Sequence, residues 1–204
     1  MGMTNFDERA RDWDADPMKV ERARAVAEAI RGALPLRPGM TALEVGCGTG
    51  LLSFALQADF ASITLADTSQ GMLDVLAVKI KAAGAANMHP IRLNLAVDPL
   101  PVQHFDVLYS LMTLHHIPDT DYILQQFRAV LEPGGWLALA DLDREDGSFH
   151  GPKMTDVHLG FERELLQAQT ERMGFDRVKF ATAFTIQKAG RVYPVFLMTA
   201  RKWA

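Results

Sequence analysis

The chain alternates short apolar runs with amphipathic stretches, a pattern typical of α/β folds. Apolar residues recur at helical spacing over residues 17–34, and Pro35 ends this first predicted helix. Further helices are expected at residues 49–58, 69–83, 120–131 and 161–173. Strands are expected at residues 41–45, 62–66, 88–93, 105–110, 136–141, 178–186 and 193–202. No helix separates the last two strands, which predicts an antiparallel hairpin closing an otherwise parallel sheet.

The composition fits one globular domain. The chain has 204 residues, 49% of them apolar and 23% charged, with a formal net charge of −4. This balance disfavours a broad basic surface for nucleic acid, and no apolar run reaches the roughly 18 residues of a membrane span. The charged start of the chain lacks the apolar core of a secretory signal, and the single cysteine, Cys47, forms no internal disulfide. We therefore expect a cytoplasmic protein without nucleic-acid or membrane partners.

A glycine-rich segment at residues 46–50 follows a predicted strand and opens a predicted helix. Glycines there let the backbone turn sharply beside a nucleotide-type cofactor, although a tight turn without a ligand has the same composition. The third glycine, Gly50, comes one residue earlier than in the dinucleotide pattern. The carboxylate of Glu44 would repel a pyrophosphate but suits a cationic ammonium group. Asp67, about 20 residues on, is placed either to accept from ribose hydroxyls or to cap the next helix.

Five segments in order extend this pattern, and together they are far more specific than any one alone. They are residues 43–50 (LEVGCGTG), 66–73 (ADTSQGML), 94–101 (NLAVDPLP), 105–116 (FDVLYSLMTLHH) and 131–139 (LEPGGWLAL). The chain thereby resembles the class I S-adenosylmethionine-dependent methyltransferases, in particular a small type 11/12-like subgroup of undefined substrate.

The resemblance implies a three-layer αβα sandwich with a seven-stranded, mostly parallel sheet of order 3-2-1-4-5-7-6 and strand 7 antiparallel. It implies one methyltransferase domain over residues 1–204, with a helical lid at 1–35 and a cofactor core at 36–142. Residues 143–204 would supply a substrate loop, a helix and the closing hairpin. The cofactor would be S-adenosylmethionine and the product S-adenosylhomocysteine.

The same resemblance implies a set of cofactor-binding residues. One of them departs from the family pattern, because Asn94 stands where an adenine-binding Asp is frequent. The amide oxygen of Asn94 can still accept a hydrogen bond. The full set is Glu44, Gly46, Cys47, Gly48, Gly50, Asp67, Thr68, Met72, Asn94, Leu95, Ser110 and Met112.

Methyl transfer from an activated sulfonium needs mainly alignment, and a base only when the acceptor atom carries a proton. Polar residues cluster after the fourth and fifth strands, where ligands bind in open α/β sheets. Among them the candidates for a base are His115, His150, His158 and Asp141. Candidates for the acceptor pocket or lid are Trp13, His115, Asp143, His150 and His158, with Asp146 and Asp156 in the same polar stretch. Packing, turn capping or anchoring are the competing interpretations of each, and no metal site is expected.

The favoured function is a methyltransferase acting on a small organic acceptor. One alternative is a protein that binds S-adenosylmethionine without transferring the methyl group, as a regulator or partner subunit. A nicotinamide-dependent oxidoreductase fits less well, because of Glu44 and the early Gly50. The motifs identify the cofactor but neither the acceptor nor the oligomeric state.

Overall fold

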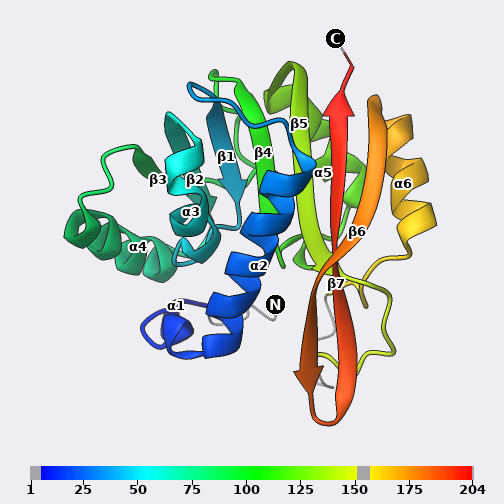
Figure 1. The fold of residues 1–204 in the computed structure, drawn as a ribbon, viewed down its shortest axis with the longest axis horizontal. Coiled ribbons are helices and arrows are strands. Elements are labelled where there is room, and N and C mark those ends of the chain that lie inside the picture. The colour runs from blue at the N-terminus through cyan, green and yellow to red at the C-terminus, as the bar shows by residue number, and fades with distance from the viewer. Residues whose placement is uncertain (1–5, 151–156, 204) are drawn as a thin grey trace.

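The seven strands of the chain form a single sheet in the order β3-β2-β1-β4-β5-β7-β6 (Figure 1), seen in a computed structural model that describes residues 6–150 and 157–203. β1 pairs in parallel with β2 and β4, and among the described residues the antiparallel strand pairings are those of β7 with β5 and β6. The predicted strand order and the antiparallel last strand are confirmed. The strands are β1 (Thr41–Val45), β2 (Ser62–Asp67), β3 (Met88–Arg92), β4 (Phe105–Leu111), β5 (Leu131–Leu142), β6 (Phe175–Lys188) and β7 (Arg191–Lys202).

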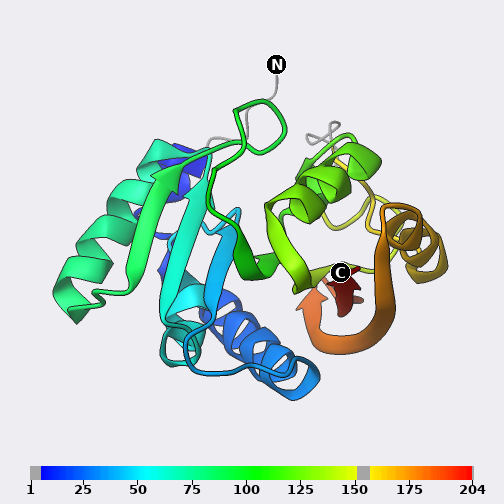
Figure 2. The same ribbon diagram turned by 90° about the horizontal axis from the view of Figure 1, so that it is seen from above.

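Helices cover both faces of the sheet and complete the predicted three layers (Figure 2). One hydrophobic cluster joins the sheet to α2, α3 and α4, and a second joins its other face to α5 and α6. The helices are α1 (Phe6–Arg9), α2 (Pro17–Ala33), α3 (Leu51–Leu56), α4 (Gln70–Ala83), α5 (Thr120–Val130) and α6 (Arg163–Arg172), with short 3-10 turns η1 (Trp13–Ala15), η2 (Gln57–Asp59) and η3 (Leu114–His116). Within the described ranges, no helix is long and apolar enough to cross a membrane.

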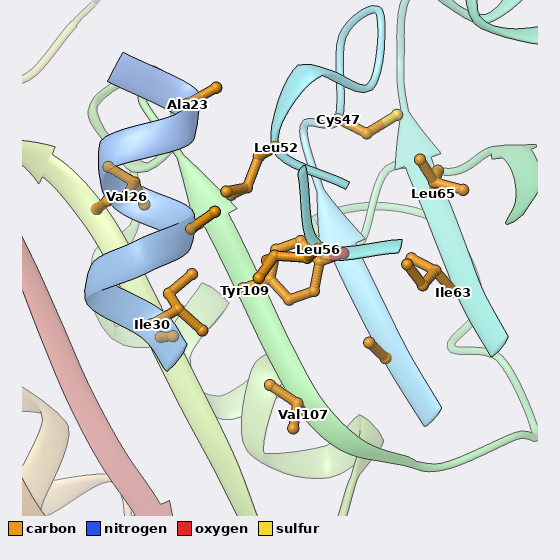
Figure 3. Packing of buried hydrophobic residues seen from close by; sticks show 14 of the residues in the cluster. Ala23, Val26, Ile30, Cys47, Leu52, Leu56, Ile63, Leu65, Val107 and Tyr109 are labelled. Atoms are coloured by element: carbon orange, nitrogen blue, oxygen red, sulfur yellow. The ribbon is translucent and has the colours of Figure 1, made fainter. Parts of the chain in front are cut away.

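The apolar stripe of α2 packs the helix against the sheet. Ala23, Val26 and Ile30 recur at helical spacing, are buried, and face Leu52 of α3 and Tyr109 of β4 (Figure 3). Burying each large aliphatic side chain contributes roughly 1.5–3 kcal/mol. Asp16 caps the start of α2 by accepting from the backbone N–H of Met18 at 3.0 Å. This packing fixes the first turns of α2 above the carboxyl ends of the central strands.

Several elements differ from their predicted limits, and the largest differences are at α3, β5 and β6. α3 begins only at Leu51, because Gly50 adopts a left-handed conformation (φ 80°) just before it. β5 begins at Leu131 instead of residue 136, since Leu131 already pairs with Phe105 before a register shift. β6 begins at Phe175, and it forms with β7 a long hairpin closed by the two-residue turn Ala189–Gly190, both at positive φ. The hairpin tip extends past the sheet on the same side as α1 (Figure 1).

Candidate cofactor and acceptor site

A cavity of about 770 Å³ lies at the carboxyl ends of β1, β2, β3 and β4. One wall is the glycine segment with residues that follow β2 and β3. Other lining residues come from the N-terminal segment, the first turns of α2, the turn η3 and the end of β6. A volume in this range is typical of small-molecule sites.

The glycine segment forms its tight turn for steric reasons. Gly46 has φ 69°, and a Cβ there would lie 2.2–2.8 Å from the side chain of Thr113. The backbone N–H groups of Gly46 and Cys47 both donate to the carbonyl of Ala66, at 2.8 and 3.0 Å. This turn holds Gly46, Cys47 and Gly48 against the cavity with no side chain on the two glycines.

Asp67 ends β2 at the edge of the cavity. Its carboxylate accepts from the backbone N–H groups of Gly48, at 2.7 Å, and Ser69, at 2.9 Å. Burial raises the pKa of Asp67, and these N–H donors oppose that effect. The cap of α4 is Ser69, whose hydroxyl accepts from the N–H of Met72. Asp67 therefore orients the glycine segment and keeps a carboxylate on the cavity wall.

Glu44 lies in the floor of the cavity within a buried hydrogen-bonded chain. Its carboxylate accepts from the hydroxyl of Ser53, which also lies 2.6 Å from the hydroxyl oxygen of Tyr109. Glu44 is only 2% exposed, and burial raises its pKa to about 8, with Ser53 opposing the shift. Burial also raises the pKa of the Cys47 thiol, so Cys47 lines the cavity as a neutral group.

The other predicted cofactor residues divide into those that line the cavity and those that do not. Gly50 and Ser110 are absent from its walls. The Ser110 hydroxyl is buried and donates to the carbonyl of Val45 at 2.7 Å, a bond that ties β4 to β1. The lining residues from the predicted set are Glu44, Gly46, Cys47, Gly48, Asp67, Thr68, Met72, Asn94, Leu95 and Met112.

The predicted base candidates His115 and Asp141 form a buried pair. The Nδ1 atom of His115 lies 2.6 Å from Oδ1 of Asp141, and the two side chains are each 1% exposed. Asp141 also accepts from the backbone N–H groups of Leu142 and His115. Burial alone would raise the pKa of Asp141, but His115 and these N–H donors outweigh it and lower the pKa. The pair fixes a His115 tautomer with hydrogen on Nδ1, which leaves Nε2 able to accept a proton.

Two more histidines pack against His115 in the cavity wall. The ring centroid of His115 is 4.1 Å from that of His116 and 4.8 Å from that of His150. Burial, reinforced by the neighbouring histidines, lowers the pKa of His116 to about 3, and burial with His115 lowers that of His150 to about 4. Both rings are therefore neutral at physiological pH.

The remaining candidates lie outside the cavity. His158 Nε2 donates to the carbonyl of Ile117 at 3.0 Å, so this side chain braces the end of η3. Asp143 accepts two hydrogen bonds from Arg163, both at 2.7 Å, and Asp146 pairs with Arg191. Asp156 is not among the described residues. Within residues 6–150 and 157–203, no group of three His, Cys, Asp or Glu side chains is placed to hold a metal ion.

The N-terminal segment covers the cofactor wall and is held there by two carboxylates. Asp7 accepts from the Ser69 hydroxyl and from the N–H of Gly71, at 2.5 and 2.8 Å. Asp14 pairs with Lys79 at 2.5 Å and also accepts from the hydroxyl of Thr49. Trp13, which lies between these two anchors, contributes to the cavity wall.

Some cavity residues did not emerge from the sequence. The local sequence around three of them gives no sign of a ligand. Arg22 lies in an amphipathic helix, Phe149 in an irregular segment and Lys188 in the hairpin. Only helical phase could have indicated Arg22, which stands four residues before Val26 on the buried side of α2. His116 ends the segment 105–116 that carries part of the resemblance, but nothing in its local sequence distinguishes it from a packing residue.

Known proteins share both the sequence pattern and the fold. A model of the methyltransferase domain, type 12, matches residues 43–137. A 27-O-demethylrifamycin SV methyltransferase of Amycolatopsis mediterranei is 30% identical over 141 residues, covering 63% of this chain and 48% of that protein. A ubiquinone biosynthesis O-methyltransferase of Coxiella burnetii is 27% identical over 151 residues, covering 70% of this chain and 62% of that one. The chain thus spans between about half and three fifths of the length of these relatives.

The fold of the chain is also shared with a solved methyltransferase structure. A phosphoethanolamine N-methyltransferase 2 of Haemonchus contortus, solved in complex with S-adenosylmethionine, superposes with a TM-score of 0.75 at 15% identity. That alignment covers all of this chain and 61% of the other. The matched segment includes the glycine turn, Asp67 and the histidine pair, and the strand order is the one expected. The chain thus has the methyltransferase fold, and its residues 43–137 match the methyltransferase domain.

Proposed function

We propose that this chain transfers a methyl group from S-adenosylmethionine to a small organic acceptor. The observation that carries the proposal is that a single cavity joins the glycine turn at Gly46 to the buried His115–Asp141 pair. Residues 36–142 would form the cofactor core, and α2 with the C-terminal hairpin would contribute the acceptor side. In this assignment the enzyme works in the cytoplasm without nucleic-acid or membrane partners.

The cavity residues fit the cofactor. Gly46 and Gly48 present bare backbone, and the Glu44 carboxylate is suited to a nearby ammonium group. Asp67 retains acceptor capacity for ribose hydroxyls, while Met72 and Leu95 offer apolar contact for a flat ring. When bound, S-adenosylmethionine supplies an already activated methyl group whose departure leaves a neutral thioether.

His115 is the residue best placed to act as a base. Among the three packed histidines in the described chain, it alone has a hydrogen-bonded carboxylate partner, and that partner holds its ring in one orientation. His116 and His150 resist protonation because of burial and their neighbours. In the proposed reaction His115 Nε2 takes the proton from an acceptor hydroxyl, amine or acidic carbon. Asp141 is a positioning residue that holds the tautomer.

Calorimetry with S-adenosylhomocysteine tests the cofactor step, and an acceptor screen tests transfer. We expect binding below millimolar concentration, followed by acceptor-dependent formation of S-adenosylhomocysteine with hydroxyl-bearing or amine-bearing small molecules. No binding at millimolar concentration would refute the proposal. Binding without transfer to any compound in a broad screen would instead indicate a non-catalytic binding protein.

A further inference from the structure

A second cavity, of about 410 Å³, lies at the amino ends of the parallel strands, opposite the cavity described above. Among its lining residues, Met40 directly precedes β1, Asp106 stands at the start of β4, and Arg201 is near the end of the antiparallel β7. In Figure 1 the C-terminal end of β7 lies at one end of the sheet, and α1 lies beside the other. Among the described residues the two cavities share no lining residue, so a ligand could occupy either one alone.

Three arginines from distant parts of the chain line this second cavity. Arg37 belongs to the connection between α2 and β1, Arg177 to the start of β6, and Arg201 to the end of β7. The chain as a whole has a formal charge of −4, so its composition does not predict such a cluster of cations. Bringing like charges together costs free energy, and an anionic ligand would offset that cost.

Two carboxylates also line the second cavity, but each has a partner other than these arginines. Asp106 accepts from the backbone N–H of Thr41 at 2.8 Å and from its hydroxyl at 3.2 Å. Glu132 is exposed and interacts electrostatically with Lys202, which is not part of the lining. Among the described residues, neither carboxylate forms an ion pair with an arginine of the cavity.

The three guanidinium groups have most of their donors free. Those of Arg37 and Arg177 are exposed and form no hydrogen bond or ion pair within the described part of the chain. Arg201 stands 6.0 Å from the ring centroid of Trp136, and its Nε donates to the carbonyl of Gly134 at 3.1 Å. These two contacts orient Arg201 and leave its terminal nitrogens able to donate to a ligand.

The backbone at Arg177 is strained in a way that its side chain does not require. Arg177 has φ 53°, a left-handed conformation that favours glycine. It lies in a β-bulge, where the pairing of β6 with β7 shifts between Asp176 and Lys179. Bulges redirect side chains, and here the bulge brings Arg177 to the cavity while the neighbouring Asp176 stays outside the lining. An arginine at a position suited to glycine is consistent with a binding role for its side chain.

We propose that this second cavity binds a phosphate group, with Arg37, Arg177 and Arg201 as its contacts. The planar guanidinium fork matches two oxygens of a phosphate, and three arginines suit a doubly charged anion. The volume is typical of small-molecule sites, and Pro35 and Trp136 offer apolar contact to the body of a phosphorylated molecule. The proposal is independent of the proposed function, because it uses no residue of the first cavity.

Calorimetry at low ionic strength tests this site with phenyl phosphate, inorganic phosphate and the neutral benzyl alcohol. The variants are Arg177→Gln and Arg37→Gln, and the matched control is Arg24→Gln, which removes the same charge from an exposed position of α2. We expect wild type to bind phenyl phosphate with a Kd below about 1 mM. Each cavity variant should weaken this binding about 5- to 20-fold, and the control should leave it unchanged.

The three probes identify the source of the phosphate group. Tighter binding of phenyl phosphate than of inorganic phosphate indicates a phosphorylated small molecule, and equal binding indicates inorganic phosphate itself. Benzyl alcohol should bind neither wild type nor variants. No saturable binding of either phosphate by wild type at millimolar concentration would overturn the proposal, as would equal affinities in wild type and Arg177→Gln.

The first cavity also has cationic residues, so a further comparison assigns the site. Arg22→Gln changes the lining of the first cavity only, and phenyl phosphate should bind this variant as it binds wild type. A loss in Arg22→Gln without a loss in Arg177→Gln would contradict the proposal. Failure of wild type to bind S-adenosylhomocysteine would refute the proposed function and would leave this comparison decisive.

Thermal unfolding separates a binding role of Arg177 from a structural one. Arg177→Gly removes the side chain and relieves the positive φ, so this variant should unfold at the same or a higher temperature than wild type. It should nevertheless bind phenyl phosphate as weakly as Arg177→Gln does. A clear fall in the unfolding temperature of Arg177→Gly would show that the side chain stabilises the fold, and would contradict the proposal.

Discussion

His115 Nδ1 and Asp141 Oδ1 lie 2.6 Å apart at the wall of the cavity, which His115 lines, and both side chains are almost fully buried. The carboxylate belongs to β5 and the imidazole to the turn η3 after β4, so two adjacent strands meet in one proton-binding unit. Asp141 is held by two backbone N–H donors as well, and it cannot rotate away without losing them. The position of the pair is thus fixed by β5 and by the turn that directly follows β4.

Replacing Asp141 by Asn should reduce turnover much more than cofactor binding. The amide keeps the shape but can donate to Nδ1 and so select the wrong His115 tautomer, so kcat should fall about 10²- to 10⁴-fold with an acceptor that carries a proton. The affinity for S-adenosylhomocysteine should stay within about twofold. Asp143→Asn is the matched control, because Asp143 pairs with Arg163 outside the cavity. Equal losses in the two variants would remove the positioning role of Asp141.

Glu44 should make the free protein less stable as pH rises. Its folded-state pKa is raised from 4.5 to about 8, so the folded protein retains a proton that the unfolded chain has lost between those values. The free energy of unfolding should therefore decrease by up to about 1.4 kcal/mol per pH unit in this window through Glu44 alone. Urea unfolding across pH 5–9 measures this slope. Glu44→Gln should flatten it and weaken S-adenosylhomocysteine binding, and an unaltered slope would contradict the assignment.

Adding a methyl group at Gly46 should disrupt the glycine turn. A Cβ would meet the Thr113 side chain at 2.2–2.8 Å, and the φ of 69° is strained for alanine. We expect Gly46→Ala to lower the free energy of unfolding by about 1–3 kcal/mol and to abolish cofactor binding. Gly32→Ala is the control: Gly32 lies within α2 with open space around it, so this change should stabilise by about 0.4–1 kcal/mol. Normal binding by Gly46→Ala would exclude the turn as a cofactor cradle.

Asp14 should influence how quickly the cofactor leaves. Asp14→Ala removes the pairing with Lys79 and the acceptor for the Thr49 hydroxyl, two contacts that hold the N-terminal segment over the cavity. Both partners are partly exposed, so roughly 0.5–1 kcal/mol is at stake and S-adenosylhomocysteine dissociation should accelerate about two- to fivefold. Stopped-flow displacement measures the rate, with Asp12→Ala, an exposed neighbour, as control. Identical rates would mean that the segment is an anchor with no gating role.

The residues that line the proposed cofactor side of the cavity could be predicted, because the pattern that marks them is local in sequence. One short pattern marks the junction between β1 and α3: a strand, three glycines and a second strand that ends in Asp67. The structure places Gly46, Cys47, Gly48 and Asp67 around one cavity wall. The role of Ser110 was harder to predict, because a small polar residue in a central strand can either contact a ligand or form a hydrogen bond between strands. Its hydroxyl bonds to Val45.

The acceptor side depends on contacts that no short segment encodes. Asp143 and His158 have the residue types of a reactive site, yet Arg163 and the Ile117 carbonyl engage them outside the cavity. Arg22 has an ordinary helical context, and its position becomes informative only once α2 is docked on the sheet beside Asp141. Residue type suggested a reactive role for Asp143 and His158. Tertiary packing, however, determines which side chains reach the cavity.

The long β6–β7 hairpin brings Ile186, Gln187 and Lys188 to the cavity wall, although they are more than 70 residues from the last cofactor residue, Met112. Gln187 and Lys188 sit beside a two-residue turn and are exposed, so their replacement leaves the buried strands intact. Under the proposed function, substrate preference and cofactor binding would therefore be separable traits in this chain. Variation at the hairpin tip would then change which molecule is methylated while the glycine turn, Asp67 and the His115–Asp141 pair stay the same.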